Sequence, residues 1–472
     1  MSGQITISIW LFFVLLVITA WAVLDRILIP STRWFLRRRI NRVIDEISTR
    51  LDIQIKPFQL TKRQVLIDRL VYDPKVIEAV RVEAQKKNCP REVIQAEVVA
   101  YAKEIVPSFN AYLYFRIGYW LAKKVARLLY RVRIGLVENQ QFENIDPDST
   151  VVFVMNHRSN MDYILVAFLA AEKAALSYAV GEWARIWPLQ TLIRAMGAYF
   201  VRRKSGNPLY RRVLERYIAM ATKEGVCQAV FPEGGLSRDG RLRKPKLGIL
   251  DYMLRNYNSA DDRDIVFIPV GINYDRTLED RSLIRELDPQ AERQSKWFAI
   301  KTTLRFFWRS IILMAMSRWQ RFGYACVNFG PQISIQQYAR KNNLDFHQMS
   351  REMRFQEIEK LAEELMAAIK NVVPILPVAL VADIMNGSDG QGLSAFEVEA
   401  RVNDVMEELQ AAGAPVYVST RSRVQTILNA LNMLKLRRLV VESDGIYRVS
   451  PGEGDVLAYY ANSIAHWRQP QL

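Results

Sequence analysis

The sequence predicts an α/β protein whose central domain, residues 132–373, contains a mainly parallel sheet. Short apolar runs rich in Val, Ile and Phe alternate with segments of helical periodicity, which is the element order of parallel sheets. The chain has 472 residues, of which 50% are hydrophobic and 24% charged, as in globular proteins large enough for several domains. The predicted strands are residues 132–137, 151–155, 198–201, 229–231, 265–270 and 325–329.

Residues 5–28 are predicted to form a transmembrane anchor. The run from Ile5 to Leu24 has no charged residue, and about 20 apolar residues span a bilayer as a helix. Arginines follow within residues 33–42, so the positive-inside rule leaves the rest of the chain on the cytoplasmic side of the inner (plasma) membrane. A cleavable signal peptide is the alternative, but the first nine residues contain no Lys or Arg.

Residues 33–131 are predicted to be mostly helical. Aromatic and basic residues interleave within 109–130 and again within 297–322. Each segment is either a helix that covers the core with a solvated basic face or a helix that lies on anionic lipid headgroups. The net charge of +16 favours an anionic partner: an acidic membrane, a phosphorylated substrate or nucleic acid.

Residues 374–472 are predicted to form a small α+β domain similar to a winged helix. Ser394 and Glu397 form a capping box that starts a helix, and a second helix covers residues 422–436. A hairpin follows, with Asp444 and Gly445 in its turn. Such an arrangement binds DNA or serves as a docking module. The three cysteines are too widely spaced for a disulfide framework or a metal site, which favours a reducing compartment.

The most informative segment is the turn between the predicted strand 151–155 and the helix that follows it. It contains His157, and Asp162 comes five positions later. An imidazole on such a turn can act as a general base, while a neighbouring carboxylate fixes its tautomer. A histidine that merely caps a helix is the structural alternative for this pair taken alone.

Three more motifs follow. Gly197 begins a short strand that ends in Arg202 and Arg203, whose guanidinium groups suit phosphate oxygens. The segment 231–241 joins a strand to an acid, two glycines and a basic stretch, and backbone N–H groups at glycines can approach an anion. The third is the buried strand 265–274, in which Pro269 predicts a sheet edge or a strand end.

In this order, the four segments resemble the membrane-bound glycerophospholipid acyltransferases. That family carries a His-x4-Asp block, a Gly-x-x-Phe-x-Arg-Arg block, a Glu-Gly block with Ser-Arg, and a block with an Ile-Pro strand. The paired arginines and the Ser237-Arg238-x-Gly240 extension are similar to glycerol-3-phosphate acyltransferases of the bacterial membrane type. The resemblance covers residues 132–373, and the C-terminal part is similar in length and placement. This chain has Leu236 where the family usually has an arginine, so Arg238 is expected to compensate.

The resemblance implies acyl transfer from acyl-CoA or acyl carrier protein to the sn-1 hydroxyl of glycerol 3-phosphate, the first step of phospholipid synthesis. His157 would be the general base and Asp162 would orient it. Asn156 and backbone N–H groups of the turn would stabilise the oxyanion. No metal or other cofactor is expected. The residues expected to bind substrate are Asn156, Arg202, Arg203, Glu233, Gly234, Gly235, Ser237 and Arg238.

Two alternatives remain open at this stage. The first alternative is an acyltransferase that uses lysophosphatidate or dihydroxyacetone phosphate as its acceptor. The second is a non-catalytic membrane adaptor whose C-terminal domain binds a partner. Anionic lipids are expected partners, whereas nucleic acid is not.

Overall fold

The computed structural model of the protein describes most of the chain. These residues are 55–135, 145–170, 175–181, 189–202, 205–288, 322–388, 390–418 and 422–468, with 9, 10, 13, 16 and 19. Most of the predicted anchor 5–28, the whole of 297–321 and Arg203 lie outside this set. Among the residues that the structure describes, no helix is both long and apolar enough to cross a membrane.

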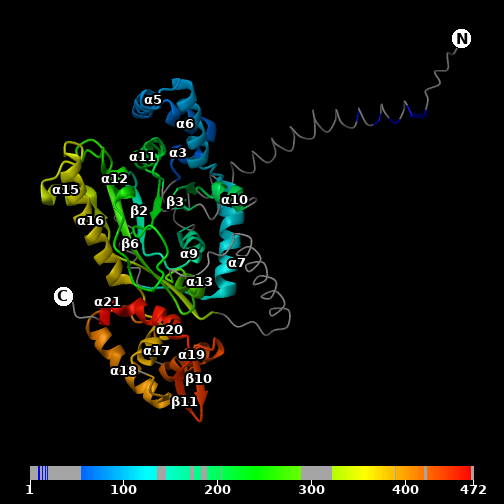
Figure 1. Ribbon diagram of the computed structural model, residues 1–472, viewed down its shortest axis with the longest axis vertical. Coiled ribbons are helices and arrows are strands. Elements are labelled where there is room, and N and C mark those ends of the chain that lie inside the picture. The colour runs from blue at the N-terminus through cyan, green and yellow to red at the C-terminus, as the bar shows by residue number, and fades with distance from the viewer. Residues whose placement is uncertain are drawn as a thin grey trace.

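A mixed, mostly parallel sheet forms the centre of the larger part of the molecule (Figure 1). Its order is β1-β7-β6-β2-β5-β3-β4, with β8 paired to β6. Neighbouring strands are parallel except where β6 meets β7 and β8, so the predicted sheet type is confirmed. The strands are β1 (Arg131–Ile134), β2 (Thr150–Met155), β3 (Ser177–Val180), β4 (Tyr199–Phe200), β5 (Gln228–Val230), β6 (Ile265–Tyr274), β7 (Tyr324–Phe329) and β8 (Ile333–Ser334). The sequence analysis missed β3 and β8.

Strand β2 is buried along its whole length because helices cover both faces of the sheet. On one face, Val152 and Val154 belong to a core cluster with residues of α4 (Arg63–Val71), α11, α12 and α16. On the other face, Phe153 and Met155 belong to a cluster with residues of α7 and α9. This explains an unbroken apolar run, since successive side chains of a strand point to opposite faces. The covering helices are α7 (Tyr119–Leu129), α9 (Met161–Ala170), α11 (Pro208–Lys223), α12 (Gly248–Leu254) and α16 (Arg351–Val372).

The inference that Pro269 marks a sheet edge or a strand end is wrong. Pro269 lies midway along β6, which has neighbours on both sides. On one side β6 pairs with β2, and on the other side its partner changes from β8, opposite Val266 and Phe267, to β7, which begins to pair at Val270. The proline stands in the gap between these two ladders, where a missing N–H costs no interstrand hydrogen bond.

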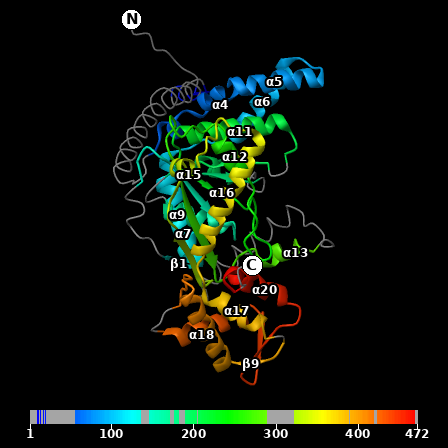
Figure 2. The same ribbon diagram turned by 90° about the vertical axis from the view of Figure 1, so that its left-hand side faces the viewer.

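The region before β1 is mostly helical in the part that the structure describes, as predicted. Helices α5 and α6 pack against α11, on the outside of the sheet domain. In Figures 1 and 2 they form the end of the molecule farthest from the C-terminal domain. The elements are α3 (Pro57–Leu60), α4 (Arg63–Val71), α5 (Pro74–Lys87), α6 (Arg91–Ile105) and the π-helix η2 (Leu113–Gly118), which runs into α7.

The C-terminal part has a hydrophobic core of its own, which extends from Ile375 to Ile464 and includes Leu283 of the sheet domain. Its sheet, β10-β11-β9, is antiparallel, and the predicted capping box and Asp444-Gly445 hairpin turn are present. Its elements are α17 (Pro377–Asn386), β9 (Leu393–Ser394), α18 (Ala395–Ala411), α19 (Arg423–Leu436), β10 (Val440–Ser443), β11 (Ile446–Val449), α20 (Gly454–Ala461), η5 (Asn462–Ile464) and α21 (Ala465–Arg468). In both ribbon views α20 lies where this part meets the sheet domain.

Remaining helices connect these layers. They are α10 (Leu189–Ala195), α13 (Asp280–Arg285) and α15 (Ile335–Asn342). Helix α13 follows β6 and packs against α20.

Candidate active site

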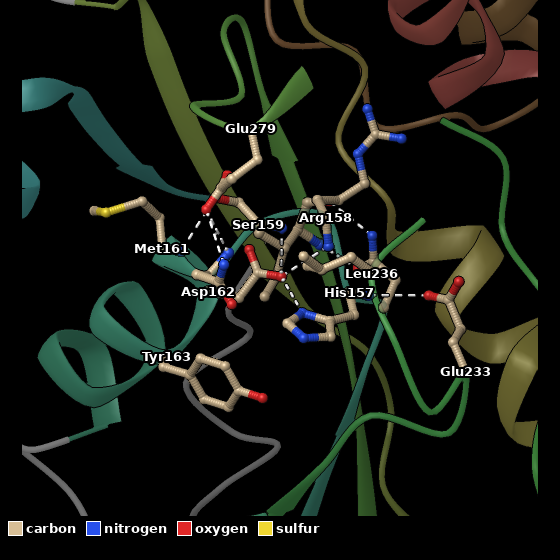
Figure 3. A network of polar contacts seen from close by, with 12 residues as sticks. His157, Arg158, Ser159, Met161, Asp162, Tyr163, Glu233, Leu236 and Glu279 are labelled. Carbon is tan, nitrogen blue, oxygen red and sulfur yellow. Dashed lines mark hydrogen bonds and ion pairs between the residues drawn. The ribbon is translucent and has the colours of Figure 1, made fainter. Parts of the chain in front are cut away.

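His157 and Asp162 meet at the end of the central strand β2. The His157 Nδ1 atom lies 2.9 Å from Asp162 Oδ2, and the side chains are 1% and 0% exposed (Figure 3). His157 belongs to the turn after β2, and Asp162 is in the first turn of α9. The carboxyl end of β2 and the first turn of α9 therefore hold the pair rigidly.

The Asp162 carboxylate accepts hydrogen bonds from several directions. Oδ2 accepts from the backbone N–H groups of Arg158 (2.7 Å) and Ser159 (3.1 Å) as well as facing His157. Oδ1 accepts from the Tyr274 hydroxyl at 2.6 Å. Burial, together with the neighbouring Asp162 charge, raises the pKa of Tyr274 well above its usual value, so this phenol remains a donor.

These contacts leave one nitrogen of His157 for chemistry. An acceptor-only carboxylate beside Nδ1 places the proton of neutral imidazole on Nδ1, so Nε2 carries the lone pair. Nε2 is buried and has no hydrogen-bond partner in the described part of the chain. In Figure 3 it points away from the carboxylate network. The ring stacks on Phe231 at a centroid distance of 4.0 Å and meets the edge of Tyr163 at 5.4 Å.

A cavity of about 350 Å³ opens beside the His157 ring; we call it the His157 pocket. Strand ends, α9, α11 and the start of α12 contribute to its wall. The aromatic and apolar lining includes Tyr163, Leu214, Phe231 and Ile249, and Gly234 and Gly235 also face it. Such a mixture suits a ligand with an apolar part and a few polar groups.

Among the described residues, three cationic side chains line the His157 pocket: Arg202, Arg211 and Lys246. Arg202 makes a bidentate ion pair with Glu104, at 2.9 and 2.6 Å, which compensates its charge. By contrast, no hydrogen bond or ion pair to another described residue engages the Lys246 ammonium group. Lys246 is therefore the pocket cation most available to an anion. The sequence analysis missed it because it lies beyond the motif 231–241.

Arg238 and Ser237 do not contact this pocket, contrary to expectation. The Arg238 side chain is 47% exposed and pairs with Glu286 at 3.1 Å. The Ser237 hydroxyl is buried, donating to the Arg241 carbonyl (2.7 Å) and accepting from the Gly240 N–H. Leu236 packs against the C-terminal core, so the position where the family usually has arginine also faces away from the pocket.

Asn156 is not free to stabilise an oxyanion, and this expectation is also corrected. Its side-chain amide donates to the Ile272 carbonyl (2.9 Å) and accepts from the Ile272 N–H (2.8 Å). Both polar atoms thus join the end of β2 to β6. The residue fixes the turn instead of contacting a ligand.

Glu233 holds the other side of the turn. Its two oxygens accept from the backbone N–H groups of His157 (2.9 Å) and Arg243 (3.0 Å), so the expected substrate contact is replaced by a positioning contact. Burial raises the pKa of Glu233 to about 7, partly offset by these two backbone donors.

Glu279 is a third carboxylate beside the turn, partly buried, which sequence reasoning missed. It accepts from the Ser159 hydroxyl (2.7 Å) and the Asn160 N–H (3.2 Å). It lies just beyond β6, and no motif marks it. Together Glu233, Asp162 and Glu279 accept the backbone N–H groups of residues 157–160. These N–H groups are therefore occupied, and the expected oxyanion donors of the turn are not available.

Comparison with known proteins identifies two regions. The family model described as Acyltransferase matches residues 136–273, and the model described as Glycerol-3-phosphate acyltransferase C-terminal region matches residues 311–468. The chain is 26% identical over 423 residues to a glycerol-3-phosphate acyltransferase of Pseudoalteromonas atlantica, covering 86% of this chain and 50% of that protein. A protein of the same name from Pseudomonas putida is 27% identical over 423 residues, covering 86% and 49%.

The chain thus spans about half the length of the curated relatives it matches. Among solved structures, the 1-acyl-sn-glycerophosphate acyltransferase of Thermotoga maritima is similar at 19% identity and a TM-score of 0.31. That similarity covers 54% of this chain and 80% of the other.

Replacing Tyr274 by Phe should lower the free energy of unfolding by about 1–3 kcal/mol, because a buried carboxylate oxygen loses its donor. Tyr199→Phe is the matched control, since the Tyr199 hydroxyl is equally buried but has no partner among the described residues. Denaturant titration of both variants measures the difference. Equal stability of the two variants would contradict the hydrogen bond to Asp162.

Proposed function

Because the chain belongs to the glycerol-3-phosphate acyltransferase family, we propose that it transfers an acyl group from a thioester to the sn-1 hydroxyl of glycerol 3-phosphate. The donor is acyl-CoA or acyl carrier protein, and the reaction is the first step of phospholipid synthesis. The observation that carries this proposal is the His157 ring, with Nδ1 fixed by Asp162 and Nε2 unpaired beside the pocket.

The geometry supports direct attack by the acceptor. Nε2 of His157 takes the proton of the acceptor hydroxyl as the oxygen attacks the thioester carbonyl. The tetrahedral intermediate collapses by breaking the carbon–sulfur bond, and the thiolate takes the proton back from the imidazolium. Asp162 stabilises the imidazolium between these steps. The thiolate is a good leaving group, so the proposal requires no metal.

The acceptor phosphate is assigned to the cationic side of the His157 pocket. Lys246 supplies an uncompensated charge, and Arg211 and Arg202 also line the pocket. The predicted role of Arg203 remains a proposal. Lysophosphatidate and dihydroxyacetone phosphate also carry phosphate, so they remain the alternative acceptors. The intact His157–Asp162 pair argues against a non-catalytic adaptor.

Attachment to the cytoplasmic face of the inner membrane is part of the proposal. The η2–α7 segment supports it, because one side packs into the core and the other exposes large apolar residues between basic ones. Trp120 is 57% exposed, and the Lys124 ammonium lies 5.8 Å from its ring centroid. The exposed residues are Arg116, Ile117, Trp120, Leu121, Lys124, Arg127 and Leu128. This composition suits anionic lipid headgroups.

The C-terminal domain is proposed to be a docking module of winged-helix type. The order α17-β9-α18-α19-β10-β11, with the antiparallel sheet beside three helices, supports this assignment. Its helix α20 faces the sheet domain, which favours a protein contact over nucleic acid.

Replacing His157 by Ala should lower kcat about 10²–10⁴-fold, since the general base is lost. His347→Ala is the control, because His347 is exposed and outside the His157 pocket. The assay is acyl transfer to glycerol 3-phosphate by the purified full chain. A His157→Ala variant that kept about a tenth of the wild-type rate would refute the mechanism.

Lys246→Ala should raise the KM for glycerol 3-phosphate about 10- to 100-fold, because a charge-assisted contact of ~1.5–3 kcal/mol is lost. Arg238→Ala should leave this KM unchanged, since Arg238 faces Glu286 on the surface. Steady-state kinetics with varied acceptor distinguishes the two cations. The reverse result would restore the phosphate role that the sequence assigned to Arg238.

A chain lacking residues 1–28 should still bind anionic vesicles at low salt, at about 1 kcal/mol for each Lys or Arg near the surface. Trp120→Glu in that chain should abolish the binding, whereas Met353→Glu, at an equally exposed apolar residue of α16, should not. Vesicle co-sedimentation at several salt concentrations measures this. Equal binding of both variants would show that α7 is not the membrane contact.

A further inference from the structure

The C-terminal domain reaches the active-site turn through Tyr459 of α20. The Arg158 guanidinium carbon lies 4.7 Å from the centroid of the Tyr459 ring, and the Tyr459 hydroxyl donates to the Arg158 carbonyl at 3.3 Å. The two residues are 301 positions apart in the chain and are 3% and 0% exposed. Arg158 directly follows His157, so this contact touches the turn that holds the base.

Arg158 depends on this ring because its charge is buried with few other partners. Nη1 donates to the Gly240 carbonyl, while Nε and Nη2 have no hydrogen-bond partner in the described part of the chain. Burial of an unpaired charge is costly, and a cation over an aromatic face gains most when both are desolvated. The Tyr459 ring is therefore a main stabiliser of the buried guanidinium.

The backbone of Arg158 connects the position of its side chain to the His157–Asp162 pair. Its N–H group donates to Asp162 Oδ2 at 2.7 Å, the same oxygen that faces His157 Nδ1. A displaced Arg158 would therefore move a donor of Asp162 and the Cα atom next to His157. The ring of Tyr459 is thus linked to His157 Nδ1 through Arg158 and Asp162.

Two more contacts join the same domain to the loop after β5. Gly240 has φ +89°, and a Cβ atom built on it would lie 1.9 Å from the Tyr459 carbonyl oxygen. The Asn462 side chain donates to the Asp239 carbonyl at 2.9 Å. This loop returns to the turn, since Ser237 N–H donates to the His157 carbonyl at 2.9 Å. The C-terminal domain thus contacts the His157 turn directly through Arg158 and indirectly through the loop after β5.

We infer that the C-terminal domain completes the active site, with Tyr459 and Arg158 as positioning residues that hold the His157 turn in its reactive geometry. The inference rests on the proposed acyl transfer for its kinetic consequences. It assigns the C-terminal domain a part in catalysis through the Tyr459 ring face, and neither residue is proposed to touch substrate.

The kinetic test compares Tyr459→Leu with Tyr459→Phe in the full chain. Loss of the ring should lower kcat at least about tenfold with little change in the acceptor KM, because a misplaced base affects the reacting geometry. Tyr459→Phe keeps the ring face and should restore most of the rate. Arg158→Met removes the charge that needs the ring, so Tyr459→Leu should have little further effect in that background.

Leu457→Ala is the matched control for simple destabilisation. Leu457 lies on the same helix, is fully buried in the C-terminal core, and belongs to none of the turn contacts. It should lower thermal stability while kcat per folded molecule stays near wild type. A parallel fall of kcat in Leu457→Ala and Tyr459→Leu, or additive effects of Arg158→Met and Tyr459→Leu, would overturn the inference.

Hydrogen–deuterium exchange supplies a readout that does not need the reaction. Peptides covering residues 150–163 should exchange faster in Tyr459→Leu than in Tyr459→Phe or Leu457→Ala. If the wild-type chain fails to acylate glycerol 3-phosphate, the proposed function is refuted. The exchange comparison still decides whether Tyr459 and Arg158 hold the His157 turn in place. Equal protection of these peptides in all three variants would refute it.

Discussion

The site depends on how the structure satisfies four consecutive backbone N–H groups at the turn between β2 and α9. These groups are in residues 157–160, of which the first three are buried and Asn160 is partly buried, and an unpaired buried donor would cost ~1–3 kcal/mol. Carboxylates from three separate segments accept all of them: Glu233, Asp162 and Glu279. Each carboxylate comes from a different strand-to-helix connection or helix start, so the turn has its geometry only when the sheet is assembled.

One carboxylate of the three has a second role. Asp162 also faces His157 Nδ1, which fixes the tautomer, while Tyr274 engages its other oxygen. Because the backbone N–H groups of residues 157–160 already donate to carboxylates, they are not available to a developing oxyanion. The positive charges of the His157 pocket, Lys246 above all, are the groups left to interact with an anionic substrate.

The C-terminal domain contacts the sheet domain at the active-site turn. Helix α20 belongs to the C-terminal core through Leu457 and Tyr460, and to the active-site turn through Tyr459. Tyr460 and Arg437 both bond Asp280, the residue after Glu279. The C-terminal domain therefore contacts the turn itself at Arg158 and the residue next to Glu279, which accepts hydrogen bonds from the turn. This arrangement gives a physical reason for a C-terminal domain in a protein whose proposed chemistry lies in the sheet domain.

The sequence alone determined the sheet class, the helical N-terminal region, the hairpin and capping box of the tail, and the His157–Asp162 pair, because each follows from local periodicity, turn chemistry or short spacing. Tertiary structure decided which polar residues face the pocket. Asn156, Glu233, Ser237 and Arg238 lie in conspicuous motifs, but their side chains bond the backbone or reach solvent. Tyr274, Glu279 and Tyr459 gain their roles from contacts across 112 to 301 positions of chain, and Lys246 from its place in the pocket wall. Strand order and domain docking set these positions, which no local pattern encodes.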